Sequence, residues 1–255
     1  MVVCGRRWGK TATGLMAVID GHGGYRGAID GATIWWVAPT FTIASLIWRQ
    51  LKKACMNGWS DKSEQEHRIE FRNGGCVTVR SADNPDSLRG EGLDGVVIDE
   101  AAFLSEACWR EALRPALADK QGWCMMISTP NGYNWFKDLF DQAATDGAWA
   151  RWQRPSSENP LIPADELEQA MRDMGLRAFA QEHLAQFTDV EGAEFSGAYF
   201  HDGVWFDNWP HSDTIRMRVM ALDPSKGKTD KSDYSAFVMI ALDFDGVMWI
   251  DADLS

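Results

Sequence analysis

Short apolar runs recur along the chain, and segments with helical spacing lie between them. The stretches VVC, TIWWVAP, GVVID and GWCMMISTP are apolar and rich in β-branched or aromatic residues, and two of them stop at a proline, which is typical of buried strands. Between them, FTIASLIWRQLKKACM carries apolar residues three and four apart, as an amphipathic helix does. Strands that alternate with helices predict an α/β fold whose mainly parallel central sheet is covered by helices on both faces.

Other regions of the chain have different patterns. HRIEFRNGGCVTVRSAD alternates around an Asn-Gly-Gly turn, which predicts a β-hairpin. Residues 156–187 begin with serine and proline and continue as two acidic amphipathic helices, and three strand-like stretches separated by turns follow after residue 212. We therefore expect three parts, residues 1–150, 151–212 and 213–255.

The formal net charge of −12 is unevenly distributed: +5 over residues 1–60, −5 over 61–122 and −12 over 123–255. This balance argues against a broadly basic nucleic-acid binder, so any DNA contact is expected to be local. The five cysteines occur singly, which is typical of reduced thiols in the cytosol. The sequence has no run of about 18 apolar residues and no hydrophobic signal segment, so we expect no membrane association.

The first predicted strand leads into CGRRWGKT, which ends like a phosphate-binding (Walker A) loop although Cys4 replaces its first glycine. Backbone N–H groups of such a loop and the following helix N-terminus bind phosphate oxygens. Lys10 would contact the β- and γ-phosphates, Thr11 would hold Mg²⁺, and Arg6 could stabilise transition-state charge on the γ-phosphate. The alternative is a chance Gly-Lys-Thr in a turn. The candidate nucleotide-binding residues are Gly5, Arg7, Gly9, Lys10 and Thr11.

An apolar run ends in two carboxylates, Asp99 and Glu100, as a Walker B motif does. In a parallel nucleotide-binding sheet the carboxyl ends of the strands face the ligand. Asp99 could then hold the Mg²⁺ ion, and Glu100 could deprotonate the attacking water. The alternative is a strand-to-helix turn in which acidic residues favour the helix N-terminus. Ser128 and Thr129 end the next run and could sense the γ-phosphate, or could simply close a strand.

Together these motifs resemble the large terminase subunit of tailed bacteriophages. The similarity rests on GRRWGKT, on the serine-containing stretch before the acidic pair (RSADNPDSLRGEGLDGVVIDEAAF), on STP, and on the later NPLIP and FAQEHLAQF segments, all in the family's order. It implies an ATP-hydrolysing motor that packages double-stranded DNA into a procapsid. Residues 1–150 would be its P-loop ATPase core and residues 151–212 a helical lid or linker.

The resemblance also implies partners and a second activity. The family's partners are double-stranded DNA, the portal protein and the small terminase subunit, and packaging is expected from a homo-oligomeric ring in the host bacterial cytoplasm. Residues 213–255 would be the first strands of an RNase H-like nuclease domain. Asp223 would be a metal-binding aspartate and Asp233 a plausible second acid for Mg²⁺ or Mn²⁺ ions that clamp a phosphodiester.

The chain departs from the family pattern at both ends. The residues that usually precede the phosphate loop and grip the adenine are missing, and only 32 residues follow Asp223. We therefore expect a piece of a longer protein whose nuclease site is incomplete. Two further interpretations are a helicase-like ATPase acting on nucleic acid and an inactive, truncated prophage remnant.

Overall fold

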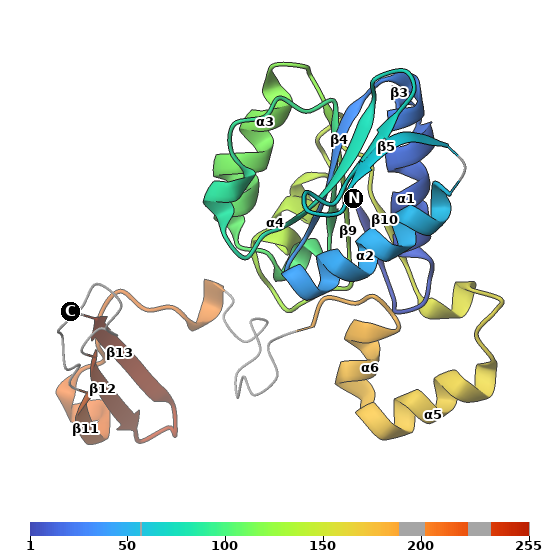
Figure 1. The fold of residues 1–255 in the computed structure, drawn as a ribbon. Helices are drawn as coiled ribbons and strands as arrows, with labels where there is room; N and C mark the ends of the chain where they lie inside the picture. Colours follow the sequence, from blue (N-terminus) through green and yellow to red (C-terminus); the bar gives the residue numbers. More distant parts are fainter. Residues whose placement is uncertain (57, 189–201, 224–235, 255) are drawn as a thin grey trace. The chain divides into compact units, whose positions relative to one another are not determined.

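The computed structural model describes residues 1–56, 58–188, 202–223 and 236–254, and it divides into the compact units Met1–Ala193 and Glu194–Ser255 (Figure 1). The larger unit is built on an eight-stranded sheet. Six adjacent strands, from β10 to β7, run parallel, and two more continue antiparallel at one edge. The expected mainly parallel sheet is therefore confirmed. In spatial order the strands are β10 (Trp152–Arg154), β1 (Val2–Cys4), β9 (Trp123–Ser128), β8 (Gly95–Asp99), β4 (Thr33–Ala38), β7 (Cys76–Ser81), β6 (Arg68–Phe71) and β5 (Trp59–Ser63).

Helices cover both faces of this sheet (Figure 1). Along β4, Trp35 and Val37 enter one apolar core, whereas Ile34 and Trp36 enter the other, because successive side chains of a strand point to opposite faces. The first core is closed by the π-helix η4 (Cys108–Leu113), α3 (Arg114–Ala118) and α4 (Trp135–Gln142). The second is closed by α1 (Lys10–Asp20) and α2 (Phe41–Ala54).

The expected hairpin is also present, since β6 and β7 pair antiparallel. The strands β2 (Gly21–His22) and β3 (Tyr25–Arg26) form a second, very short antiparallel pair after α1. The sheet extends past residue 150, the expected end of the first part, because β10 pairs in parallel with β1. The two expected acidic helices follow as α5 (Ala164–Met174) and α6 (Leu176–Glu182).

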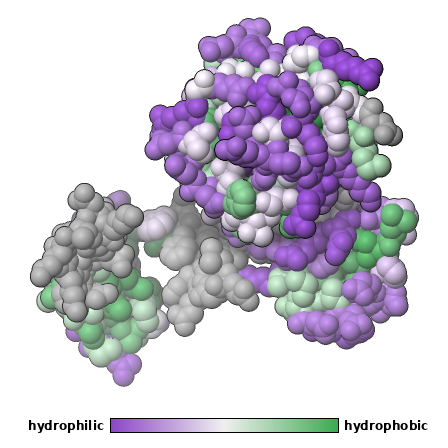
Figure 2. All heavy atoms as spheres, viewed as in Figure 1, coloured by the Kyte–Doolittle hydropathy of each residue, from purple (hydrophilic) through white to green (hydrophobic). Residues whose placement is uncertain are grey.

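The smaller unit contains an antiparallel sheet of β11 (Ile215–Asp223), β12 (Ala236–Asp243) and β13 (Met248–Leu254). Its described apolar side chains are largely exposed, among them Met220 at 71% and Met248 at 61%, and Figure 2 shows hydrophobic atoms gathered over this sheet. Of its described residues only Ala241 and Asp243 are buried. These strands thus bury little apolar surface against one another.

Candidate functional site at the carboxyl ends of the parallel strands

The segment from Gly5 to Gly9 joins β1 to α1 and has the backbone of an anion-binding loop. Arg7 (φ 63°) and Gly9 (φ 115°) have positive φ angles, a conformation that side-chain-bearing residues rarely adopt. Helix α1 begins at Lys10, and no side-chain cap bonds its first N–H groups. Turns of this kind, followed by an uncapped helix N-terminus, direct N–H groups and the positive end of the helix dipole toward an anion.

Lys10 lies against this loop and is only 8% exposed. Its Nζ donates hydrogen bonds to the carbonyl oxygens of Cys4 (2.8 Å) and Gly5 (3.2 Å). Burial lowers the pKa of the Lys10 ammonium, and the nearby negative charge of Glu100 and Asp99 opposes that shift. Because an ammonium has three N–H donors, two bonds to the loop leave one donor for a phosphate oxygen.

The acidic pair lies at the end of β8 and is held by specific bonds. Asp99 is 4% exposed, and burial, with the adjacent negative charge of Glu100, raises the pKa of its carboxyl to about 7. Glu100 has a left-handed backbone (φ 45°), and its N–H donates to Asp99 Oδ1 at 3.1 Å. The Glu100 carboxylate accepts hydrogen bonds from the Thr129 N–H (3.2 Å) and the Ser128 hydroxyl (3.3 Å).

These contacts follow from strand order. Strand β9 lies between β1 and β8, so Ser128 and Thr129 come between the phosphate loop and the acidic pair. Both are buried, and Ser128 Oγ also accepts the Ala102 N–H at 3.2 Å. Any displacement of the Glu100 carboxylate would therefore disturb the backbone at the end of β9.

The structure thus brings Lys10, Asp99, Glu100, Ser128 and Thr129 together, and it places Thr11 in the first turn of α1. The hydroxyl of Thr11 and the carboxylate of Asp99 are oxygen ligands of the type that Mg²⁺ prefers, so these residues fit that ion. Arg6 instead faces α6, where its Nε donates to Glu182 Oε2 at 2.5 Å. Arg89, in the serine-containing stretch before the acidic pair, pairs with Asp86 and Glu111.

The two predicted nuclease residues fall in the unit Glu194–Ser255. Asp223 is the last residue of β11 in the smaller unit, and Asp233 lies outside the described residues. The described part of the chain contains no cluster of three or more His, Cys, Asp or Glu side chains suited to a metal ion.

Sequence reasoning missed a group of residues, all from the segment after β10, that bond the phosphate loop or the loop after β9. Ser156 and Asn159 bond carbonyl oxygens of the loop, Glu182 pairs with Arg6, and Gln181 accepts the Gly132 N–H after β9 at 3.2 Å. Their signal in the sequence is weak, because short polar stretches such as SSEN are typical of ordinary connecting turns.

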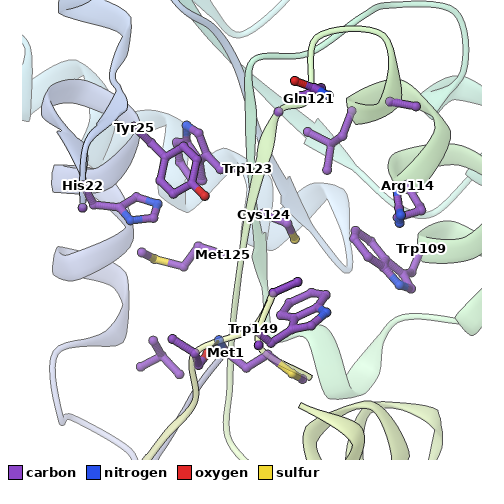
Figure 3. Close-up of a pocket in the computed structure, with 18 of the residues that line it drawn as sticks. Met1, His22, Tyr25, Trp109, Arg114, Gln121, Trp123, Cys124, Met125 and Trp149 are labelled. Atoms are coloured by element: carbon purple, nitrogen blue, oxygen red, sulfur yellow. Dashed lines mark hydrogen bonds between the residues drawn. The ribbon is translucent and has the colours of Figure 1, made fainter. Parts of the chain in front are cut away.

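A cavity of about 720 Å³ lies at the amino ends of the parallel strands, opposite their carboxyl ends. Figure 3 shows His22, Tyr25 and Trp123 on one side of it and Trp109 and Arg114 on the other. It contains no residue of the phosphate loop or the acidic pair. Although large apolar pockets are the usual first candidates for ligand sites, this one lies apart from the predicted chemistry.

The parallel sheet, with the phosphate loop after β1 and the acidic pair after β8, has the P-loop NTPase fold. Residues 53–202 match the family described as "Terminase large subunit, T4likevirus-type, N-terminal". The chain belongs to this terminase large subunit family.

Relatives and solved structures agree with this assignment. The chain is 30% identical over 167 residues to the large terminase subunit of Escherichia phage T5, a match that covers 62% of this chain and 38% of that protein. It is 51% identical over 61 residues to the large subunit of Thermus phage G20c, a match that covers 24% of this chain and 13% of that protein. The matched part is therefore well under half of each curated relative.

Two solved structures share the fold. The large terminase ATPase domain of Thermus phage P74-26 superposes with a TM-score of 0.60 at 23% identity, covering 74% of this chain and 88% of that one. The large terminase of another thermophilic bacteriophage, solved in complex with ADP, superposes with a TM-score of 0.60 at 16% identity, covering all of this chain and 62% of that one.

Proposed function

We propose that this chain binds and hydrolyses ATP as the motor subunit that packages double-stranded DNA into a phage procapsid. The observation that carries the proposal is the Glu100 carboxylate, which is bonded to Ser128 and Thr129 beside the buried pair Lys10 and Asp99. In this proposal a base, a phosphate-binding cation and a sensor strand lie together at the carboxyl ends of the parallel strands. The ADP and ATP-gamma-S complexes of the thermophilic bacteriophage large terminase support nucleotide as the ligand.

In this proposal each residue has a separate task. The Gly5 N–H already donates to the Arg154 carbonyl, so the N–H groups of Arg7 and Gly9 would bind phosphate oxygens, and Lys10 would add its third donor. Thr11 and Asp99 would hold Mg²⁺, which when bound neutralises charge on the phosphates. Glu100 orients the attacking water and accepts its proton.

Arg6 and the sensor residues would connect this chemistry to motion. Once released from Glu182, the Arg6 guanidinium could stabilise charge on the γ-phosphate. Ser128 and Thr129 would report movement of the Glu100 carboxylate to the loop after β9, which Gln181 ties to α6. A nucleotide-dependent change would thereby reach the segment that contains α5 and α6.

The first test is Mg²⁺-dependent ATP hydrolysis with and without double-stranded DNA. Lys10→Ala should abolish nucleotide binding, whereas Lys53→Ala, on the exposed face of α2, should not. Glu100→Gln should retain binding and lose at least 100-fold in turnover, on the order of what a positioned general base contributes. Glu66→Gln, an exposed acid, is its matched control. Unchanged turnover in Lys10→Ala or Glu100→Gln would refute the site, and turnover that DNA does not stimulate would argue against a translocase.

We further propose that the smaller unit begins an RNase H-like nuclease domain. Support comes from its three consecutive antiparallel strands and from the position of Asp223 at the end of β11. Mn²⁺ titration monitored by paramagnetic broadening of amide signals should affect residues next to Asp223, and Asp223→Asn should remove the effect. No broadening there at saturating Mn²⁺ would remove Asp223 from the proposed metal site.

The proposed partners follow from the motor role. They are the portal protein, the small terminase subunit and further copies of this chain in a ring, in the host bacterial cytoplasm. None of the described helices is both long and apolar enough to cross a lipid bilayer. Sedimentation of the chain with purified portal protein, with and without ATP, tests the first of these interactions.

A further inference from the structure

Two side chains distant in sequence from the phosphate loop hold its carbonyl groups. Ser156 Oγ donates to the Arg6 carbonyl at 2.6 Å, and Asn159 Nδ2 donates to the Arg7 carbonyl at 2.5 Å. Both come from the turn around the 3₁₀ helix η5 (Ser156–Glu158). We propose that Ser156 and Asn159 are positioning residues that set the direction of the loop's peptide groups, an inference that rests on the proposed ATP-binding function.

The geometry of the peptide bond explains how Ser156 acts. In a trans peptide the C=O and the following N–H point in opposite directions, and the structure has no cis peptide in its described residues. Because the Arg6 carbonyl points at Ser156, the Arg7 N–H points away from η5. Ser156 therefore directs this N–H toward the concave side of the loop, where a phosphate would lie.

Asn159 acts on the strained residue of the loop. Arg7 has a left-handed backbone that its Cβ disfavours, and the turn around it is closed by the Trp8 N–H, which donates to the Gly5 carbonyl at 3.3 Å. The bond from Asn159 to the Arg7 carbonyl stabilises this conformation from outside. Without this bond, we expect Arg7 to relax to negative φ, which would turn its peptide groups away from the anion-binding arrangement.

The supporting turn is itself firmly held, so it can impose a direction on the loop. Ser156 is fully buried, and its N–H donates to the His183 carbonyl at 2.7 Å. The Gly5 N–H donates to the Arg154 carbonyl at 3.0 Å. The Asn159 amide is oriented by the Leu161 N–H, which donates to its Oδ1 at 3.0 Å and leaves its NH₂ group facing the loop.

The test measures binding of MgATP-gamma-S by calorimetry in the full chain. Ser156→Ala and Asn159→Ala should each weaken binding roughly threefold to tenfold, the range expected for one lost hydrogen bond. Ser157→Ala, an exposed neighbour in the same turn, should leave affinity within twofold. In the absence of nucleotide, the amide NMR signals of Arg7 and Trp8 should shift in the first two variants and stay in place in the third.

A double-mutant cycle separates this role from general support of the fold. Glycine accepts positive φ without strain, so in an Arg7→Gly background Asn159→Ala should change affinity by less than twofold. Asn159→Asp keeps the size of the side chain but removes the donor, and it should weaken binding at least as much as Asn159→Ala.

Three results would overturn the proposal. They are equal affinities for the Ser156, Asn159 and Ser157 variants, an equal effect of Asn159→Ala in both backgrounds, and unmoved Arg7 and Trp8 amide signals. If the wild-type chain itself fails to bind nucleotide, the proposed ATPase function falls together with this inference. Wild-type binding with indifferent variants overturns the inference alone.

Discussion

Gly5→Ala tests why the residue after Cys4 in the phosphate loop is a glycine. A Cβ at Gly5 would lie 2.4 Å from the His183 carbonyl oxygen, 2.4 Å from Ser156 Oγ and 2.8 Å from the Ser156 nitrogen. Ordinary contact begins near 3.4 Å, so the 154–183 segment would have to move by about 1 Å. That shift would break the bonds that join the segment to the loop, from Ser156 Oγ to Arg6 and from Gly5 N to Arg154. At about 1 kcal/mol for each bond, with residual overpacking around the new Cβ, we expect a loss of about 2–3 kcal/mol.

Urea denaturation followed by circular dichroism measures this loss, and a thermal scan should show a decrease of roughly 5–10 °C in Tm. Gly147→Ala is the matched control, because its added Cβ would meet no atom within 4 Å and should change stability by about 0.5 kcal/mol or less. Amide hydrogen exchange in Gly5→Ala should quicken over residues 154–183. A stability within about 0.5 kcal/mol of wild type, with protected amides in that segment, would refute the packing argument.

Three further predictions concern other parts of the larger unit. Gly14→Ala should destabilise it by about 1–2 kcal/mol in urea denaturation although alanine favours helices, because the new Cβ would lie 2.7 Å from the buried Trp36 ring; a gain in stability would contradict this. Burial alone would raise the pKa of Asp94, but a backbone N–H and the Lys120 ammonium outweigh it and leave that pKa below its ordinary value. Asp94→Asn should therefore cost about 1 kcal/mol at pH 7, and the difference from wild type should begin to shrink below about pH 4 and vanish once the pH is below the lowered pKa of Asp94; a constant difference down to pH 2 would contradict the assignment. Burial raises the pKa of the Cys4 thiol to about 11, so iodoacetamide at pH 8 should leave Cys4 unmodified in the native chain and alkylate it in urea, as mass spectrometry would show.

The local pattern of the sequence was sufficient for most elements of the larger unit. Apolar runs ended by proline predicted β4 and β9, and the Asn-Gly-Gly turn predicted the β6–β7 hairpin, because these signals arise within a few residues. Strand β10 was missed, since it has three exposed residues and no alternation that could mark it. It forms only because β1 offers a parallel edge.

The candidate site likewise has one part that the local sequence predicts and another that it does not. The sequence by itself determined which residues we propose to carry the chemistry, namely Lys10, Thr11, Asp99 and Glu100, because the predicted phosphate loop and the acidic pair are contiguous motifs. Only the tertiary structure decided that Ser128 bonds Glu100, that Arg6 faces Glu182, and that the turn containing Ser156 and Asn159 directs the loop's peptide groups. These contacts join segments 28 to 176 residues apart, and their geometry depends on strand order and packing, which no local spacing of residues encodes.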